Sequence, residues 1–268
     1  RQAQQEEIAE SIVGEVIKEP SPFVEQVMAD AERLSAEDEP YHREPITYEA
    51  PYLDNLPTAP REKFAANIAA IQKLKEIEQR VANGGSPAFE DEQRILAQYT
   101  GWGGLSDAFD PNKSAWSNEY SQLKAALSES EYEAARSSTL TAFYTPATVI
   151  HPIYRALERF GVKGGKILEP SMGTGAFLAH GHFGSSDAKF YGVELDSITG
   201  RISKQLYQKA NIQVTGYENA LLPDNYFDCV IGNVPFGNFQ VNDPQYNRLH
   251  FPIHDYFFAK SIDKLRTG

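Results

Sequence analysis

Apolar positions follow two different patterns along the chain. Between residues 61 and 140 they recur every three or four positions, which is the spacing of the buried face of a helix. The longest such stretch predicts a helix over 64–77, and Gly84 and Gly85 supply a stop signal after it. Three more helices are expected in this region, over 89–99, 116–127 and 130–136.

From residue 141 onward, short apolar runs alternate with stretches of helical period. Strands are expected over 166–169, 190–194, 212–214 and 227–232. The expected helices of this region lie over 145–160, after residue 175 and over 197–209. Strands that alternate with helices are typical of an α/β fold with a parallel sheet, so we expect such a sheet here.

The first 60 residues show neither pattern in a sustained form. They contain seven prolines, 14 acidic residues and 4 basic residues, a net charge of −10. The remaining residues hold 23 acidic and 21 basic residues, so most of the chain's net charge of −12 lies in residues 1–60. We expect residues 1–60 to form an acidic, proline-containing arm or tether. The nearly neutral body is compatible with a nucleic-acid partner, for which a net charge of −12 alone is unfavourable.

Composition narrows the classes of protein further. Cys229 is the single cysteine, which excludes an internal disulfide framework and a four-cysteine zinc site. The apolar runs are shorter than the roughly 18 residues of a membrane span, and the chain starts at Arg1 without a signal-peptide pattern. His180 and His182 are a candidate metal pair, but nothing near them completes a site, so no metal is expected. We expect a cytoplasmic protein that is part of a longer polypeptide.

A glycine-rich turn follows the first expected strand. Glu169 and Pro170 end that strand, and Gly173 and Gly175 lead into a helix. Glycines let the backbone approach a ligand closely, and a helix N-terminus favours a carboxylate or phosphate, so this turn is a candidate nucleotide-type cradle. A dinucleotide fingerprint has a third glycine where this chain has Leu178, which makes a NAD-dependent dehydrogenase a distant interpretation. An ordinary tight strand-to-helix turn is the alternative.

Glu194 ends the next expected strand, 19 residues after Gly175. A carboxylate at that place can accept hydrogen bonds from both hydroxyls of a ribose, as in dinucleotide-binding folds. Asp196 is the less suitable candidate, and a solvated acid after a strand is the alternative interpretation. The glycine turn and Glu194 support each other because they end adjacent strands of one sheet.

Asn233, Val234, Pro235 and Phe236 come directly after the fourth expected strand, at the edge where open α/β sheets bind ligands. The Asn233 Oδ1 atom and the Val234 carbonyl are two acceptors that can converge on one amino group. Pro235 stiffens the turn, and Phe236 offers a flat face for stacking on a base. Two acceptors on its hydrogens increase the electron density of a planar amine, which is otherwise a poor nucleophile. The segment indicates amine chemistry, with a plain turn as the alternative.

Together these segments resemble the motif series of amino-methyltransferases. In chain order they are Phe143-Tyr144-Thr145-Pro146, Leu168-Glu169-Pro170 with Gly173 and Gly175, Gly192-Val193-Glu194-Leu195-Asp196, and Asn233-Val234-Pro235-Phe236. The order is similar to that of the gamma class of adenine-N6 DNA methyltransferases, and the likeness covers residues 141–268. The helical region, with its Gly-Trp-Gly-Gly-Leu turn over 101–105, resembles the stretch before the methylase domain of very large phage and plasmid proteins. Those proteins join a methylase to a helicase and are associated with DNA mobility or antirestriction.

The resemblance implies a Rossmann-like, S-adenosylmethionine-dependent methyltransferase sheet over 141–268, incomplete at its C-terminus and preceded by a helical region over 61–140. It also implies roles for individual residues. The implied cofactor residues are Tyr144 and Thr145 for the methionine part, Glu169, Pro170, Gly173 and Gly175 for the methionine and ribose, Glu194 for the ribose hydroxyls, Leu195 for the adenine, and Glu218 for the adenine amino group. The implied catalytic residues, which hold the target amine and base, are Asn233, Val234, Pro235 and Phe236.

Two departures from the family pattern matter. Val234 stands where the family usually has proline, but this position acts through its carbonyl, so the change need not destroy function. The chain stops after the Leu-Arg-Thr-Gly segment 265–268, where family members continue with further strands and a target-recognition part. We therefore expect little or no catalysis from residues 1–268 alone. The expected partners are DNA and further domains of the same polypeptide, such as a helicase or a target-recognition domain.

The leading hypothesis is methyl transfer from S-adenosylmethionine to the N6 amino group of adenine in DNA, within a larger restriction-modification, antirestriction or DNA-mobility protein. Such transfer needs neither a metal nor a covalent intermediate. Cys229 lies inside a strand without a preceding proline and is expected to be a core thiol. Two alternatives stay open: a methyltransferase of RNA bases or protein amides, and a non-catalytic DNA-processing scaffold with a methylase fold.

Overall fold

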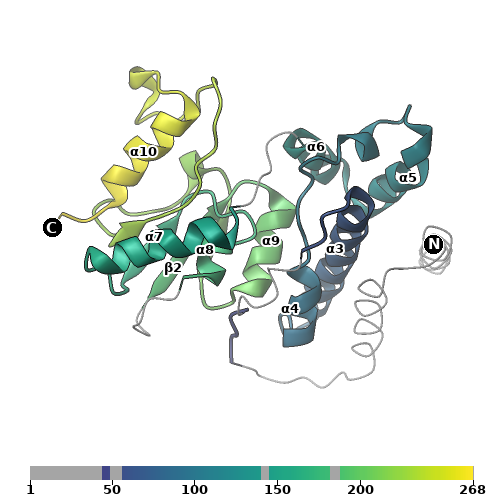
Figure 1. Cartoon of the computed structure of the whole chain (residues 1–268), viewed down its shortest axis with the longest axis horizontal. Helices are drawn as coiled ribbons and strands as arrows, with labels where there is room; N and C mark the ends of the chain where they lie inside the picture. Colours follow the sequence, from purple (N-terminus) through teal and green to yellow (C-terminus); the bar gives the residue numbers. More distant parts are fainter. Residues whose placement is uncertain (1–43, 49–55, 140–144, 182–187, 268) are drawn as a thin grey trace. The chain divides into compact units, whose positions relative to one another are not determined.

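The computed structural model describes residues 44–48, 56–139, 145–181 and 188–267 (Figure 1). These residues form two compact units. The first unit holds residues 57–139, and the second holds residues 44–48, 56, 145–181 and 188–267. Most of the predicted acidic arm, the predicted cofactor residue Tyr144 and the candidate metal ligand His182 lie outside the described residues.

The first unit consists of helices. They are α3 (Pro60–Ala82), α4 (Glu90–Leu96), α5 (Ser117–Ala126) and α6 (Glu129–Ser138), with 3-10 turns at Ser106–Phe109 and Ser114–Trp116. The apolar stripe predicted for α3 is buried, and Phe64, Ile71 and Leu74 are each at most 2% exposed. Gly84 adopts a left-handed conformation (φ +85°) just after α3, so the helix ends where the sequence predicts.

The glycine-rich turn around Trp102 is packed into the core of this unit. Trp102 is 1% exposed and lies edge-on against Phe109, with the ring centroids 5.3 Å apart. Asn67 of α3 fixes the turn, because its side chain donates to the Gly101 carbonyl (2.6 Å) and accepts from the Thr100 N–H (2.8 Å). The large aromatic ring thus serves packing within the helical unit.

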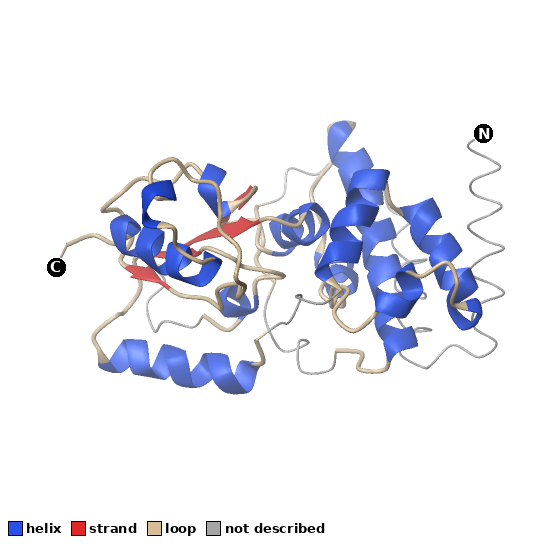
Figure 2. Ribbon diagram, turned by 90° about the horizontal axis from the view of Figure 1, so that it is seen from above, coloured by secondary structure: helices blue, strands red, loops and turns tan. Residues whose placement is uncertain are grey.

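The second unit is built on a parallel sheet of four described strands. They are β1 (Lys166–Glu169), β2 (Lys189–Glu194), β3 (Asn211–Val214) and β4 (Cys229–Val230), in the spatial order β3-β2-β1-β4. The helices are α7 (Ala147–Arg159), α8 (Ala176–Ala179), α9 (Ser197–Leu206) and α10 (Ile253–Lys264), with 3-10 turns at Tyr217–Asn219 and Asn247–Leu249. Figure 2 shows helices on both sides of the red strands. The predicted α/β fold with a Rossmann-like parallel sheet is confirmed.

Alternate residues of β1 face two separate cores, because successive side chains of a strand point to opposite faces of a sheet. Ile167 packs in a cluster with Tyr154 of α7. Leu168, its neighbour, packs in a cluster with Tyr256 and Phe257 of α10. Both β1 side chains are fully buried, so α7 and α10 cover opposite faces of the sheet.

The strand order creates a switch point between β1 and β4. From β1 the chain continues to β2 and β3 in one direction, whereas β4 pairs with the other side of β1. In open α/β sheets, ligands bind beyond the carboxyl ends of the strands at such a point. Glu169, Glu194 and Asn233 all stand at or after carboxyl ends, so the fold places three of the predicted site residues at this edge.

Several elements are shorter than the sequence predicts, among them the fourth strand and the helix α9. In place of a strand over 227–232, only Cys229 and Val230 pair with β1. Phe227 instead forms a parallel bridge with Leu265. The helix α9 ends at Leu206 rather than at residue 209. Within the described ranges, none of the helices combines the length and apolar character needed to cross a membrane.

Residues 44–48 belong to the second unit and pack against the end of α9. Thr47 forms an antiparallel bridge with Tyr207, and the Tyr48 N–H donates to the Leu206 carbonyl (2.8 Å). Tyr48 is 5% exposed. These five residues therefore form a docked arm instead of a free tether. Their partners are distant in the sequence, which is why the local pattern of residues gave no sign of the contact.

Candidate active site

The turn after β1 is shaped by two glycines in left-handed conformations. Gly173 (φ +55°) donates its N–H to Glu194 Oε2 (2.8 Å), and Pro170 is buried where the turn begins. Gly175 (φ +80°) is the N-cap residue of α8, and a Cβ atom there would lie 2.3 Å from the Tyr207 ring. Both the backbone conformation and the lack of space require glycine at this position. The turn therefore runs close to the end of β2.

Glu194 joins two backbone segments at the end of β2. Its Oε1 accepts from the Asp196 N–H (2.7 Å), and its Oε2 accepts from the Gly173 N–H. Burial raises the pKa of Glu194 to about 7, although these backbone donors favour the charged form. Asp196 has a different task, because its Oδ1 accepts from the Thr199 N–H (2.8 Å) and caps α9. Of the two acids, Glu194 is the one bonded to the glycine turn.

Glu169 ends β1 next to the switch point and is 2% exposed. Its Oε2 atom is buried and has no hydrogen-bond partner among the described residues. Burial raises the pKa of this carboxyl well above its usual range, and the nearby Glu194 raises it further. Buried polar atoms nearly always have a partner, so an unsatisfied oxygen at this edge fits a site where a ligand supplies one.

The segment 233–236 leaves β4 beside the glycine turn. The Ser171 hydroxyl, which belongs to that turn, donates to the Asn233 carbonyl (2.9 Å). The Asn233 side chain is exposed, whereas Val234 is half-buried and packs on the core beneath α10. One hydrogen bond thus connects the predicted cofactor turn with the predicted amine-binding segment.

Phe236 presents its ring to solvent beside α10. Its side chain is 72% exposed, while Pro235 before it is half-buried. The His254 ring lies 6.0 Å from the Phe236 ring, with 33° between the planes. The Nδ1 atom of His254 is buried and has no hydrogen-bond partner in the described part of the chain. Most of the Phe236 ring is accessible to a stacking partner.

The remaining predicted cofactor residues lie along the same edge of the sheet or just before α7. Leu195 follows β2 and is 75% exposed. Glu218 is in the 3-10 turn after β3, where its carboxylate accepts from the Asn219 side chain (2.9 Å). Thr145 is half-buried two residues before α7, and the predicted contact Tyr144 lies outside the described residues.

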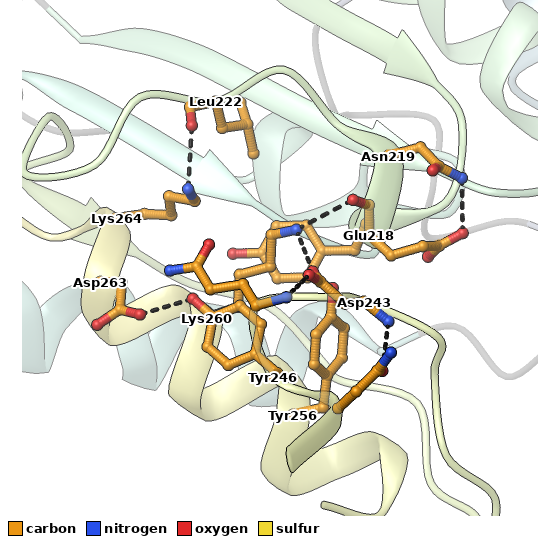
Figure 3. Close-up of polar contacts among 12 residues, drawn as sticks. Glu218, Asn219, Leu222, Asp243, Tyr246, Tyr256, Lys260, Asp263 and Lys264 are labelled. Carbon is orange, nitrogen blue, oxygen red and sulfur yellow. Dashed lines mark hydrogen bonds and ion pairs between the residues drawn. The ribbon is translucent and has the colours of Figure 1, made fainter. Parts of the chain in front are cut away.

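Sequence reasoning missed a buried polar cluster behind the segment 233–236. Lys260 of α10 and Asp243 are both 5% exposed and form an ion pair (2.9 Å) (Figure 3). The Tyr256 hydroxyl donates to the Asp243 carboxylate (2.8 Å). A signal was present in the sequence, because Lys260 falls on the helical stripe that contains Ile253, Tyr256 and Phe257. A lysine within an apolar stripe needs a buried partner.

Parts of this chain are similar to known proteins. Residues 129–255 match the family model described as N-6 DNA Methylase. This segment is therefore similar to the N-6 DNA methylase family. The matched segment includes the glycine turn, Glu194 and the segment 233–236.

Two proteins similar to this chain are viral. It is 28% identical over 232 residues to "Defense against restriction protein B" of Escherichia phage P1, covering 85% of this chain and 8% of that protein. It is 33% identical over 95 residues to "Modification methylase CviBIII" of Paramecium bursaria Chlorella virus NC1A, covering 35% of this chain and 25% of that protein. The chain therefore spans less than a tenth of the first relative and a quarter of the second. A solved structure from Methanococcus maripaludis, assigned as an S-adenosyl-L-methionine-dependent methyltransferase, matches with a TM-score of 0.33 and 20% identity over 45% of this chain and 53% of that one.

The residues at the switch point fit the cofactor of the family, which is S-adenosyl-L-methionine. The buried Glu169 Oε2 lacks a partner, as expected where a ligand completes the hydrogen bonding. Glu194 retains acceptor capacity, since a carboxylate offers about four lone-pair sites and backbone donors of Gly173, Leu195 and Asp196 occupy three of them. The exposed Leu195 follows it and offers an apolar surface for a planar ring.

Proposed function

We propose that this methylase domain transfers a methyl group from S-adenosyl-L-methionine to the N6 amino group of adenine in DNA. The observation that carries the proposal is the meeting of two segments at one switch point. The glycine turn with Glu169 and Glu194 has the chemistry of a cofactor cradle, and the Ser171–Asn233 hydrogen bond (2.9 Å) joins it to a segment with the chemistry of an amine clamp. Methyl transfer requires these two ligands to be adjacent.

On the cofactor side, Glu194 would accept hydrogen bonds from the ribose hydroxyls, and Leu195 would lie against the adenine. Glu218 would accept from the adenine amino group. Glu169, Pro170, Gly173 and Gly175 would line the methionine and ribose, and Thr145 with Tyr144 would contact the methionine part. When bound, S-adenosylmethionine supplies an electrophilic methyl group. The chain's own contribution is to orient the cofactor and exclude water around it.

On the substrate side, the exposed Asn233 Oδ1 and the Val234 carbonyl would accept hydrogen bonds from the two hydrogens of the target amine. This arrangement increases the electron density on the nitrogen and fixes its lone pair in one direction. The target adenine has to leave the duplex to reach the segment, which costs a few kcal/mol. The exposed Phe236 ring, backed by His254, would offset part of that cost by stacking on the base.

We further propose that the domain works within a larger polypeptide that acts on DNA in restriction, modification or antirestriction. The phage P1 relative carries the printed name "Defense against restriction protein B", and this chain spans 8% of it. Further domains would then supply DNA target recognition or helicase activity. The helical residues 57–139 and the acidic arm would connect the methylase domain to them.

The decisive experiment is methyl transfer by the intact protein carrying Asn233→Ala. We expect N6-methyladenine in DNA, measured by mass spectrometry of nucleosides, to fall by a factor of about 100 or more, as is typical when a transition-state contact is removed. Cofactor binding should be retained, because Asn233 lies on the substrate side. Asn211→Ala is the matched control, since Asn211 is also exposed but starts β3 at the opposite end of the sheet.

The same assay distinguishes the other functions. Methyl transfer to RNA or to a protein amide, with none to DNA, would keep the enzyme class and change the substrate. Unchanged DNA methylation by the Asn233→Ala protein would contradict the proposed role of the segment 233–236. Cofactor binding without transfer to any of the three acceptors would favour a non-catalytic scaffold.

A further inference from the structure

The face of α10 that packs on the sheet carries two lysines, Lys260 and Lys264, one helical turn apart. Their side chains are 6% and 7% exposed, respectively. Each one binds a backbone carbonyl of the chain between β3 and β4, as Figure 3 shows. Lys260 binds the Glu218 carbonyl (3.3 Å), and Lys264 binds the Leu222 carbonyl (3.0 Å). The two lysines differ in the rest of their contacts.

Lys260 also reaches the loop that follows the segment 233–236. Its Nζ lies 2.9 Å from Asp243 Oδ2, and the Tyr256 hydroxyl donates to the same oxygen (2.8 Å). The second oxygen, Asp243 Oδ1, accepts from the Gln245 N–H (3.1 Å). Burial alone would raise the pKa of Asp243, but the hydrogen bonds from Lys260 and Tyr256 outweigh it and lower this pKa. Asp243 is therefore a charged residue at the centre of the turn that it organises.

A buried ion pair is a weak means of stabilising a fold, because desolvation of the two charges cancels much of their attraction. The Lys260–Asp243 pair instead fixes the position of the Glu218 turn relative to the loop around Asp243. Lys260 Nζ contacts the Glu218 backbone on one side and Asp243 on the other. Hydrogen bonds are directional, so those from Lys260 hold the Glu218 turn and the Asp243 loop in defined positions. Apolar packing restricts such positions less.

Resting on the proposed function, we infer that Lys260 and Asp243 are positioning residues for the cofactor's purine. By binding the Glu218 carbonyl, Lys260 holds the 3-10 turn so that the Glu218 carboxylate faces the 6-amino group. Through Asp243 the same lysine ties this turn to the loop that continues from the target-binding segment. The pair therefore sets the selectivity for a 6-amino purine and places the purine side of the site relative to the substrate side.

The test compares binding of S-adenosylhomocysteine with binding of S-inosylhomocysteine, which has an oxygen in place of the 6-amino group. The intact protein should prefer the adenine compound by about tenfold, the value of one hydrogen bond to a charged group. Lys260→Met should reduce this ratio to within about twofold. Lys264→Met is the matched control, because it removes an equally buried lysine on the same helix without touching Glu218 or Asp243, and it should keep the ratio.

Asp243→Asn provides a second variant with a smaller disturbance, since asparagine keeps the size and the acceptor for Tyr256. It should also reduce the preference for S-adenosylhomocysteine over S-inosylhomocysteine. Circular dichroism tests whether the variant is folded. A ratio that stays at the parent value in folded Lys260→Met or Asp243→Asn protein would overturn this inference alone. An equal loss of selectivity in Lys264→Met would overturn it as well, because that result indicates general loosening. Absence of binding of either compound by the unmodified protein would overturn the proposed function and this inference with it.

Discussion

Two carboxyl groups at the ends of neighbouring strands share one small region of the site. Glu169 has a buried oxygen with no partner among the described residues, and Glu194 holds the glycine turn through its hydrogen bonds. Burial raises the pKa of both groups; the nearby Glu194 adds to the effect on Glu169, and the nearby Asp196 adds to the effect on Glu194. The protonation of these two residues therefore makes the properties of the site depend on pH.

We expect cofactor affinity to increase with pH up to about 7 and then to level off. The pKa of Glu194 is about 7 in the free protein, and ribose hydroxyls bind its charged form, so binding below this pH must release a proton. Affinity should fall by up to about tenfold for each pH unit below 7. Calorimetry at pH 6 and pH 8, in buffers with different ionisation enthalpies, measures both the affinity and the released protons.

Glu194→Gln is the control, and it should bind weakly with little dependence on pH. An affinity that decreases from pH 6 to pH 8 would contradict the assignment of Glu194. The contribution of Glu194 to folding stability changes with pH in the opposite direction to cofactor affinity. Because the folded-state pKa is raised, Glu194 contributes stability below its unfolded pKa of about 4.5, and this contribution is lost as the pH rises through about 7.

At the scale of elements, the turn that connects β1 to α8 depends on Gly175. Gly175 is in the left-handed conformation, and its missing side chain leaves room for the Tyr207 ring from the end of α9. Gly161, which follows α7, has a similar conformation (φ +90°), but a Cβ there would meet nothing within 4 Å. These two glycines allow backbone strain to be separated from steric overlap within one unit.

We expect Gly161→Ala to destabilise the second unit by about 1 kcal/mol, which is the cost of the left-handed conformation. Gly175→Ala should cost about 1–3 kcal/mol more, because the added carbon overlaps the Tyr207 ring. It should also weaken cofactor binding, which Gly161→Ala should leave unchanged. Urea denaturation followed by circular dichroism measures the two free energies of unfolding. Equal losses for both variants would show that the Tyr207 ring moves aside at no cost.

The sequence predicted the helices and strands that depend on the spacing of nearby apolar residues. The period of the apolar residues fixed the buried face of α3, and the runs ending at Glu169 and Glu194 fixed β1 and β2. The position of Asn233 at the sheet edge followed from the strand before it. What the pattern missed depends on distant partners: the bridge from Thr47 to Tyr207 and the ion pair between Asp243 and Lys260.

At the scale of the whole molecule, the two units have separate cores, one around Trp102 and α3 and one on each face of the sheet. The residues proposed to bind cofactor and substrate all belong to the second unit. The proposed chemistry is therefore confined to the second unit.

We expect Leu74→Ala to destabilise the first unit by about 2–5 kcal/mol, because Leu74 is fully buried in α3. Cofactor affinity should stay within about twofold of the parent value, since the second unit keeps its own core. Hydrogen exchange with mass spectrometry resolves the two regions in one experiment. Parallel loss of protection in residues 57–139 and in the sheet would show that the units unfold together.

The short arm at residues 44–48 changes the limits of the proposed methylase domain. Because these residues pair with the end of α9, the second unit is discontinuous in the sequence, and the helical unit is an insertion between its two pieces. A gene fragment that begins at residue 141 would encode the sheet without its first piece. Any recombination that moves the domain intact between proteins must carry the helical insertion with it.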